Sequence, residues 1–282
     1  MIEKFSLSYI YMNKNRILPY IKKNLLIKPY YKLRFFLARK NIFLSNNERN
    51  IRDLKNIYKG KRVFVLGNGP SINVNDINML KEEITFAANK IFLMYEQTSW
   101  RPTYYCVEDD LVMQQNFDKI NELKGSTKLF PADMLSYSKR VEDALYFSFI
   151  HKDLNNEKLP NVSIDAMKGV YWGSTIVYSM VQLAIYMGAS EINILGVDFS
   201  FDVPKGHDKK KKEITSEGEV NHFHKDYRKK GEKWNLPNLD IQKKSFVSLR
   251  NFSDNGNIKI FNATRGGKLE VLVRKRYFMS YN

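Results

Sequence analysis

The sequence predicts an α/β domain built on a mostly parallel sheet. One observation is the stretch 63–66, four consecutive apolar residues that end at Gly67. Such a run is typical of a strand buried on both faces. A second is the alternation of short apolar runs with helical patterns between residues 84 and 107, and a third is the repeat of the strand and glycine arrangement at 191–196. Strands that alternate with helices form parallel sheets.

The composition indicates a folded protein with an anionic partner. The 282 residues are 43% hydrophobic, which is enough for one large domain with additions. A net charge of +16 favours nucleic acid, anionic lipid or a phosphorylated substrate as that partner. The single cysteine, Cys106, excludes an internal disulfide. Because no long apolar run or secretory signal pattern occurs either, we expect a cytoplasmic protein.

Residues 1–45 are predicted to form a basic, aromatic-rich helical extension. In residues 1–40, ten Lys or Arg accompany a single acidic residue, Glu3, and aromatic and aliphatic residues lie between them. A helix of this kind can lie in a bilayer interface with its lysines toward anionic headgroups. It can equally pack on its own domain or on a second subunit, so both peripheral membrane contact and a homo-oligomer stay open.

Residues 46–282 are predicted to form the α/β domain itself. Apolar residues at helical spacing predict a helix over 47–60, before the strand at 63–66. The further predicted strands are 84–86, 103–107, 128–130, 144–149, 191–195 and 258–261. Four further helices are predicted. The first begins at Pro70, the second contains Ile91, Phe92 and Tyr95, and the other two span 176–187 and 241–252.

The turn after the first strand reads Gly67, Asn68, Gly69, Pro70 and Ser71. Glycines permit close backbone approach, and a proline followed by serine is typical of a helix start. A strand, a glycine turn and a helix N-terminus together present backbone N–H groups to an anion, so we expect a phosphate cradle here. The turn lacks the third glycine of the dinucleotide fingerprint and the ending of a Walker loop, so a plain connection is the alternative.

Polar residues follow the other predicted strands, and the carboxyl ends of parallel strands share one edge of a sheet. These residues are Asn89, Glu108, Asp109, Asp110, Gly173, Ser174, Thr175, Asp198 and Arg265. The acidic triplet could hold a divalent ion between phosphates, bind a ribose hydroxyl, or form a solvated turn. Gly173 to Thr175 could add N–H groups to the crevice or simply cap a helix, and Arg265 could meet an anionic group.

Residues 202–240 lose all periodicity and contain three of the four histidines. A long irregular segment that concentrates His and aromatic residues favours a functional lid. His222 and His224 are candidates for a general base, and Asp226 could orient either one. Zinc ligation by these three is the rival interpretation, although no fourth ligand is evident. His207 is a weaker candidate.

These motifs, in this order, resemble the bacterial sialyltransferases of glycosyltransferase family 42. They also resemble the related domain family typified by archaeal hydroxymethylpterin pyrophosphokinase, the MptE-like family, which is often encoded with surface-polysaccharide genes. The matching segments cover about residues 60–275. They are Gly67 to Ser71, Asn89, Gly188, Glu191, Ile192, Leu195 to Phe199, and the histidine-containing lid.

The resemblance implies a modified Rossmann-like fold, a variant of the GT-A type, and a CMP-activated nonulosonic acid as donor. It implies inversion at the anomeric carbon without a required metal. Asn68, Gly69 and Ser71 match the segment that holds the nucleotide phosphate and ribose, and Asn89 matches an asparagine near the donor. The second lid histidine of the family is its general base, which is His224 by order, with His222 as the alternative.

The resemblance therefore predicts an inverting glycosyltransferase of bacterial surface-glycan synthesis, with a glycan or glycolipid acceptor. Where the sialyltransferases have an asparagine after the third strand, this chain has Glu108 and Asp109. The acidic pair keeps a Mg-dependent pyrophosphokinase open as the alternative function. No nucleic-acid-binding motif occurs, so we expect no nucleic-acid partner.

Overall fold

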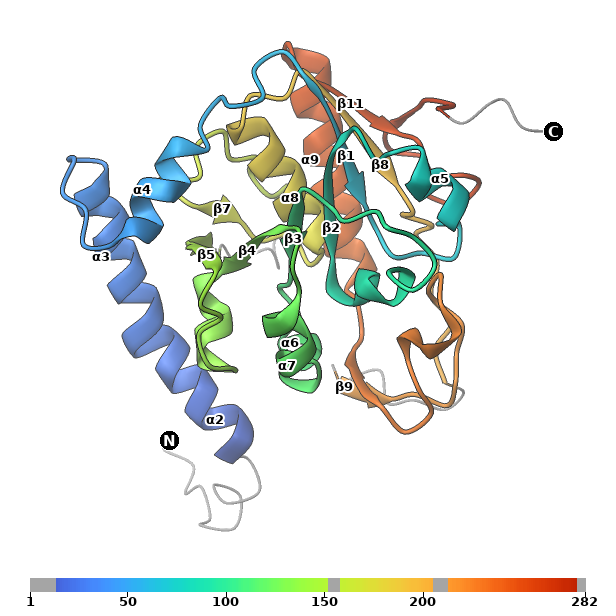
Figure 1. Cartoon of the computed structure of the whole chain (residues 1–282), viewed down its shortest axis with the longest axis horizontal. Coiled ribbons are helices and arrows are strands. Elements are labelled where there is room, and N and C mark those ends of the chain that lie inside the picture. The colour runs from blue at the N-terminus through green and yellow to red at the C-terminus, as the bar shows by residue number, and fades with distance from the viewer. Residues whose placement is uncertain (1–13, 152–157, 205–212, 278–282) are drawn as a thin grey trace.

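The computed structural model describes residues 14–151, 158–204 and 213–277. At its centre is an eight-stranded sheet in the order β12-β11-β8-β1-β2-β3-β4-β5, in which every neighbouring pair is parallel (Figure 1). The strands are β1 Arg62–Leu66, β2 Ile84–Ala88, β3 Tyr104–Cys106, β4 Thr127–Pro131, β5 Ala144–Phe147, β8 Glu191–Leu195, β11 Lys259–Asn262 and β12 Val273–Arg274. The predicted α/β, Rossmann-like class is confirmed.

The central strand explains the continuous apolar run in the sequence. Val63 pairs with Ile84 of β2 on one side and with Ile192 of β8 on the other. Residues 63–66 have no exposed surface, because β1 has neighbours on both edges and helices pack on the sheet. One of those helices, α8 (Ile176–Tyr186), contacts β1 and is buried along its whole length.

The order of the strands creates a crevice beside β1. The chain runs outward from β1 through β2, β3, β4 and β5, and then returns to place β8 on the opposite side of β1. The connections that leave β1 and β8 therefore diverge at the carboxyl edge of the sheet. In open parallel sheets this switch point is where ligands bind.

The helices lie close to the predicted positions, with two corrections. Residues 70–71 form a turn, and the helix that was expected at Pro70 begins only at Val74, because Asn73 accepts a hydrogen bond from the Asp76 N–H at 2.9 Å and caps it there. The helix expected over 47–60 ends at Asp53. The remaining helices are α4 Asn46–Asp53, α5 Val74–Asn78, 3-10 helix η2 Asn89–Met94, α6 Asp110–Gln115, α7 Phe117–Glu122, 3-10 helix η3 Ala132–Ser136 and α9 Leu239–Asn255.

The described part of the N-terminal extension is one helical rod along the side of the molecule (Figure 1, blue). It consists of α2 (Lys14–Ile21), a π-helical stretch η1 (Lys22–Ile27) and α3 (Lys28–Ala38). Tyr31, Phe35 and Ala38 are each 2% exposed and belong to the main hydrophobic core. The extension therefore packs on its own domain, which is one of the expected arrangements.

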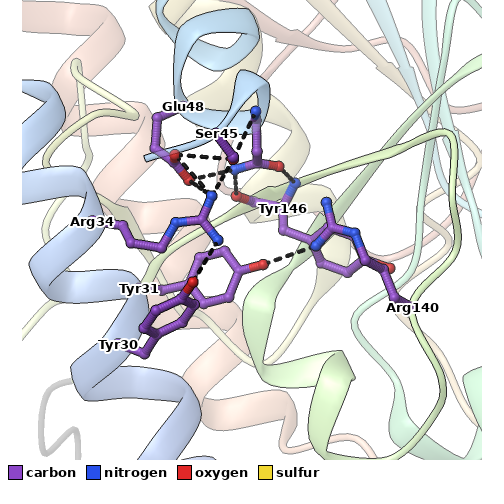
Figure 2. A network of polar contacts seen from close by, with 8 residues as sticks. Tyr30, Tyr31, Arg34, Ser45, Glu48, Arg140 and Tyr146 are labelled. Carbon is purple, nitrogen blue, oxygen red and sulfur yellow. Dashed lines mark hydrogen bonds and ion pairs between the residues drawn. The ribbon is translucent and has the colours of Figure 1, made fainter. Parts of the chain in front are cut away.

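A polar network joins this rod to the domain (Figure 2). Arg34 and Glu48 form an ion pair at 2.7 Å with 7% and 0% of their side chains exposed. Ser45, the N-cap of α4, accepts a hydrogen bond from the Asn47 N–H at 3.1 Å, and its hydroxyl donates to Glu48 Oε2 at 3.2 Å. The Asn47 side chain bonds both the N–H and the C=O of Tyr146, so α4 is attached to the edge strand β5.

The segment predicted as an irregular lid contains some regular structure. Strands β9 (Glu213–Thr215) and β10 (Lys233–Asn235) pair antiparallel, and a 3-10 turn η4 (Lys225–Tyr227) lies between them. Residues 205–212, including His207, lie outside the described residues. A further small pair, β6 (Phe149–Ile150) with β7 (Val170–Tyr171), extends from β5.

Candidate active site

A cavity of about 270 Å³ opens at the carboxyl edge of the sheet, between the β1 and β8 turns, the start of α8 and the lid. It brings together most of the residues singled out from the sequence. Those that line it are Gly67, Asn68, Gly69, Asn89, Glu108, Asp109, Asp110, Ser174, Thr175, Asp198 and His222. Those that do not line it are Pro70, Ser71, Gly173, His224 and Arg265.

The two glycines of the β1 turn are required by the packing of the β8 turn. A Cβ on Gly67 would lie 2.3 Å from the Gly196 oxygen, and one on Gly69 would lie 1.9 Å from Asp198 Oδ2. Both glycine N–H groups donate to this neighbouring turn, to Leu195 at 2.7 Å and Gly196 at 2.9 Å. The glycines therefore hold β1 and β8 close together, and their N–H groups are already bonded.

The expected phosphate cradle holds an internal carboxylate instead. Ser71 donates to Asp198 Oδ2 through its hydroxyl at 2.9 Å and its N–H at 3.3 Å. Pro70 has no N–H to offer. The expectation that Gly69 to Ser71 present free N–H groups is therefore wrong, because Asp198 satisfies the turn from within.

Unpartnered polar atoms are concentrated around the same cavity. Five residues that line it each carry a buried atom without a hydrogen-bond partner in the described part of the chain. They are Asn68 (Oδ1), Asn89 (Oδ1), His222 (Nδ1), Arg228 (Nη1) and Trp234 (Nε1). Buried polar atoms are normally bonded, so a cluster of exceptions on one cavity wall indicates a site for a ligand.

The two asparagines are held rigidly. Asn68 donates through Nδ2 to the Ala88 oxygen at 3.1 Å, which leaves Oδ1 as an acceptor. Asn89 has a left-handed backbone with φ of 54°, and its own carbonyl accepts from Tyr105 at 2.6 Å. Asparagine tolerates this conformation better than most residues, which fits its position directly after β2.

The two lid histidines have different surroundings. His222 stacks on Tyr227 with ring centroids 3.7 Å apart and 5° between the rings. Burial, with the charges of Arg228 and Lys90 in support, holds the pKa of His222 well below its usual value, so the imidazole is neutral at neutral pH. His224 Nδ1 accepts the Asp226 N–H at 3.1 Å and caps η4 outside the cavity. The fold thus places His222, and not His224, at the site.

The acidic residues after β3 have different hydrogen-bond partners. Glu108 accepts a hydrogen bond from Ser179 at 2.8 Å, and burial raises its pKa to about 7. Asp109 caps α6 by accepting the N–H groups of Leu111 and Val112. Within the described residues, no three His, Cys, Asp or Glu side chains lie close enough together to hold a metal ion.

The remaining predicted residues have structural roles. Thr175 is the N-cap of α8, accepting the Val177 N–H at 3.4 Å. A Cβ on Gly173 would lie 2.4 Å from atoms of both Tyr178 and Ser245, so the close approach of α8 and α9 requires glycine there. Arg265 forms a bidentate ion pair with Asp76 and does not reach the cavity.

Several residues on the cavity wall were not predicted from the sequence. Besides Arg228 and Trp234, they include Trp172, Tyr227 and Asn235. Asn235 donates to Asp109 at 3.2 Å and Asp110 at 2.8 Å, which ties the lid to the end of β3. For the residues in the lid the only sequence signal was its density of aromatic and basic residues, and for Trp172, which lies outside the lid, there was none.

Comparisons with known proteins identify the family. A search of solved structures finds the MAf glycosyltransferase from Magnetospirillum magneticum AMB-1, with 14% identity and a TM-score of 0.46, over 82% of this chain and 38% of that one. It also finds the sialyltransferase CstII from Campylobacter jejuni, in complex with the substrate analogue cytidine-5'-monophosphate, with 13% identity, a TM-score of 0.44 and coverage of 79% and 88%. This chain thus spans well under half of the first structure. No curated protein matches the sequence. The family model described as 6-hydroxymethylpterin diphosphokinase MptE-like matches residues 39–204, so the chain belongs to the MptE-like family.

Proposed function

We propose that this protein is an inverting glycosyltransferase that binds a nucleotide-activated sugar in the cavity beside β1. The observation that carries the proposal is the cluster of unpartnered polar atoms around that cavity. The two asparagine oxygens are acceptors for ribose, sugar or base hydrogens, whereas Arg228 and Trp234 are donors for phosphate or carbonyl oxygens. A nucleotide sugar offers both kinds of group within one molecule.

His222 is the proposed general base. Its imidazole lines the cavity and is neutral at neutral pH, so it can accept a proton. An acceptor hydroxyl loses its proton to His222 while its oxygen attacks the anomeric carbon. The bond from that carbon to the nucleotide phosphate breaks in the same step. A single displacement of this kind inverts the configuration at the anomeric carbon.

The finer identity of the substrates rests on the sequence resemblance. It favours a CMP-activated nonulosonic acid as donor, no required metal ion, and a glycan or glycolipid acceptor. Such an enzyme would work on the cytoplasmic side in bacterial surface-glycan synthesis. Asn68 and Asn89, which match the family segment near the nucleotide, both line the cavity, and this supports the assignment of that segment to donor binding.

Two measurements test the proposal. Thermal unfolding with CMP, UDP, GDP and ATP, each with and without Mg²⁺, identifies the nucleotide, and we expect CMP to stabilise without Mg²⁺. His222→Gln should retain nucleotide binding and lose about 10²- to 10⁴-fold of transfer activity, the usual contribution of a general base. His224→Gln is the matched control and should retain transfer. Unchanged turnover in His222→Gln would contradict the assignment.

A Mg-dependent pyrophosphokinase is the second candidate, because the chain belongs to a family described by that activity. Glu108 and Asp109 are among the carboxylates that line the cavity, and they would hold a Mg²⁺ ion there. This function predicts that ATP stabilises the protein only with Mg²⁺ and that chelation abolishes activity. Stabilisation by CMP alone, with no response to ATP and Mg²⁺, would exclude it.

A further inference from the structure

Arg228 is a half-buried cation that forms no ion pair in the described part of the chain. Its guanidinium lies against the Trp234 ring, with Cζ 3.4 Å from the ring centroid, and its Nη1 is buried without a hydrogen bond. Both side chains line the cavity. The stacking fixes the plane of the guanidinium, so its N–H groups have a defined direction.

The carboxylates near Arg228 are engaged elsewhere. Glu232 pairs with Lys90, and Glu219 accepts hydrogen bonds from Ser216 and the Glu217 N–H. Asp109 accepts two backbone N–H groups of α6 and the side chain of Asn235. Burial lowers the pKa of Arg228 to about 10, which leaves it charged at neutral pH. An uncompensated buried charge is destabilising unless a ligand neutralises it.

Asp198 also lines the cavity, and its carboxylate disfavours an anion beside it. Asp198 occupies the turn at Gly69, where it accepts from Ser71. An anionic group is therefore disfavoured at the glycine turn and favoured at the lid. The sequence analysis expected the anion to bind at the glycine turn, whereas the structure favours its binding at the lid.

We propose that Arg228 anchors the phosphate of the ligand at the lid end of the cavity, and that the glycine turn faces hydroxyl groups instead. The proposal rests on the proposed function for the identity of the ligand, a nucleotide-activated sugar. It adds the orientation of that ligand and a residue that selects for a phosphate.

The test compares CMP with cytidine, which lacks the phosphate, by calorimetric titration. Arg228→Met should weaken CMP binding about 10- to 100-fold and leave cytidine binding unchanged, since it removes charge-assisted hydrogen bonds to phosphate only. Arg228→Lys keeps the positive charge but lacks the planar pair of N–H donors of the guanidinium, so it should give an intermediate loss of CMP affinity. Arg265→Met is the matched control and should not change either affinity. Equal losses for CMP and cytidine, or no loss for CMP, would overturn the proposal.

Binding of inorganic pyrophosphate tests the anion site at Arg228 independently of the proposed glycosyltransferase function. If no nucleotide binds, stabilisation of the wild type by pyrophosphate, absent in Arg228→Met, still supports the anion site. If neither nucleotides nor pyrophosphate bind, the anion site is wrong. Without ligand, Arg228→Met should melt at or above the wild-type temperature, because it removes a charge that has no ion-pair partner. If Arg228→Met does not fold, Arg228→Lys replaces it in the binding measurements.

A second inference rests on the outer face of the N-terminal rod. Large apolar side chains lie on this face and point away from the buried residues Tyr31 and Phe35. Leu18, Ile21, Leu25, Leu26, Leu33 and Phe36 are between 44% and 70% exposed. Contiguous exposed apolar surface of this kind marks a docking site. No helix that the structure describes has the length and apolar content to cross a bilayer.

The charge around this face is entirely positive. No acidic residue occurs from residue 18 to residue 47. The exposed Lys22, Lys32 and Lys40 form no ion pair in the described part of the chain. Two copies joined through this face would bring like charges together, whereas anionic headgroups would complement them.

We infer that the outer face of the rod docks on an anionic membrane surface, with its leucines among the acyl chains and its lysines at the headgroups. Flotation with phosphatidylcholine vesicles, with and without phosphatidylglycerol, tests this. The wild type should bind the anionic vesicles, and Leu25→Gln/Leu33→Gln should lose at least tenfold of that binding. Met79→Gln is a matched control because Met79 is exposed at the C-cap of α5, outside the rod.

The contribution of charge is tested separately. Lys22→Gln/Lys32→Gln/Lys40→Gln should weaken binding to anionic vesicles and remove its salt dependence. Equal binding of the leucine variant and the wild type would overturn the inference. The inference would also be overturned if light scattering showed that the wild type is a dimer that does not bind vesicles, and that the leucine variant is a monomer.

Discussion

Glu108 permits a quantitative test, because its carboxyl ionises in a buried position. Ser179 donates to it at 2.8 Å, but burial raises its pKa from 4.5 to about 7. Each pKa unit corresponds to about 1.4 kcal/mol, so ionised Glu108 destabilises the folded state by on the order of 3 kcal/mol. Between pH 4.5 and about 7 the folded protein binds more protons than the unfolded chain. The stability contributed by protonated Glu108 is therefore lost as the pH rises through this window.

Glu108→Gln removes the ionisation and keeps both the size of the side chain and the oxygen that accepts from Ser179. The variant should match the wild type near pH 5 and exceed its free energy of unfolding by on the order of 2 to 3 kcal/mol at pH 8. Urea unfolding of both proteins from pH 5 to pH 8 measures this difference. Subtraction cancels the groups that titrate equally in both proteins.

The control is Glu122→Gln, since Glu122 is exposed at the end of α7. Because Glu122 lies on the surface, this substitution should change the free energy of unfolding by no more than about 0.5 kcal/mol. A difference for Glu108→Gln that stays constant from pH 5 to pH 8, or a variant that is less stable at pH 8, would refute the reasoning.

Two further predictions concern the packing that positions the site. Glu48→Ala should lower the free energy of unfolding by about 3–5 kcal/mol in urea, because it leaves Arg34 buried without its partner. Glu270→Ala breaks an exposed pair with Arg274 and should cost far less, because water screens that pair, and equal losses would contradict the argument. Gly69→Ala should cost about 1–3 kcal/mol by the same measurement, because the new Cβ would overlap Asp198. A Gly69→Ala protein of unchanged stability would show that the turn is not tightly packed.

Much of the sheet was predictable because its signals are local. The β8 prediction has the observed bounds of Glu191–Leu195. The β1 prediction differs from the observed strand by one residue at its start, and the β11 prediction by one residue at each end. Buried parallel strands carry continuous apolar runs, and a run of that kind between glycines leaves few alternatives.

The sequence did not reveal which wall of the cavity favours an anion. The turn at Gly67 has the local features of a phosphate cradle, yet Asp198, far away in sequence, satisfies it. The lid prediction did include both histidines, but only the folded lid distinguishes His222 on the cavity wall from His224 at the η4 cap. Pairing between distant residues depends on the three-dimensional path of the chain, which no local pattern records.

The sequence by itself determined the parallel sheet, the edge at which polar residues gather, and membership of the MptE-like family. These depend on hydrophobic periodicity and on glycine positions, which are properties of short segments. The tertiary structure alone decided which of the gathered side chains are satisfied by one another and which still lack a partner. Residue type does not make the difference, because Asp198 and Arg228 both have ionisable side chains. Asp198 accepts hydrogen bonds from Ser71, whereas Arg228 Nη1 has no hydrogen-bond partner within the described chain.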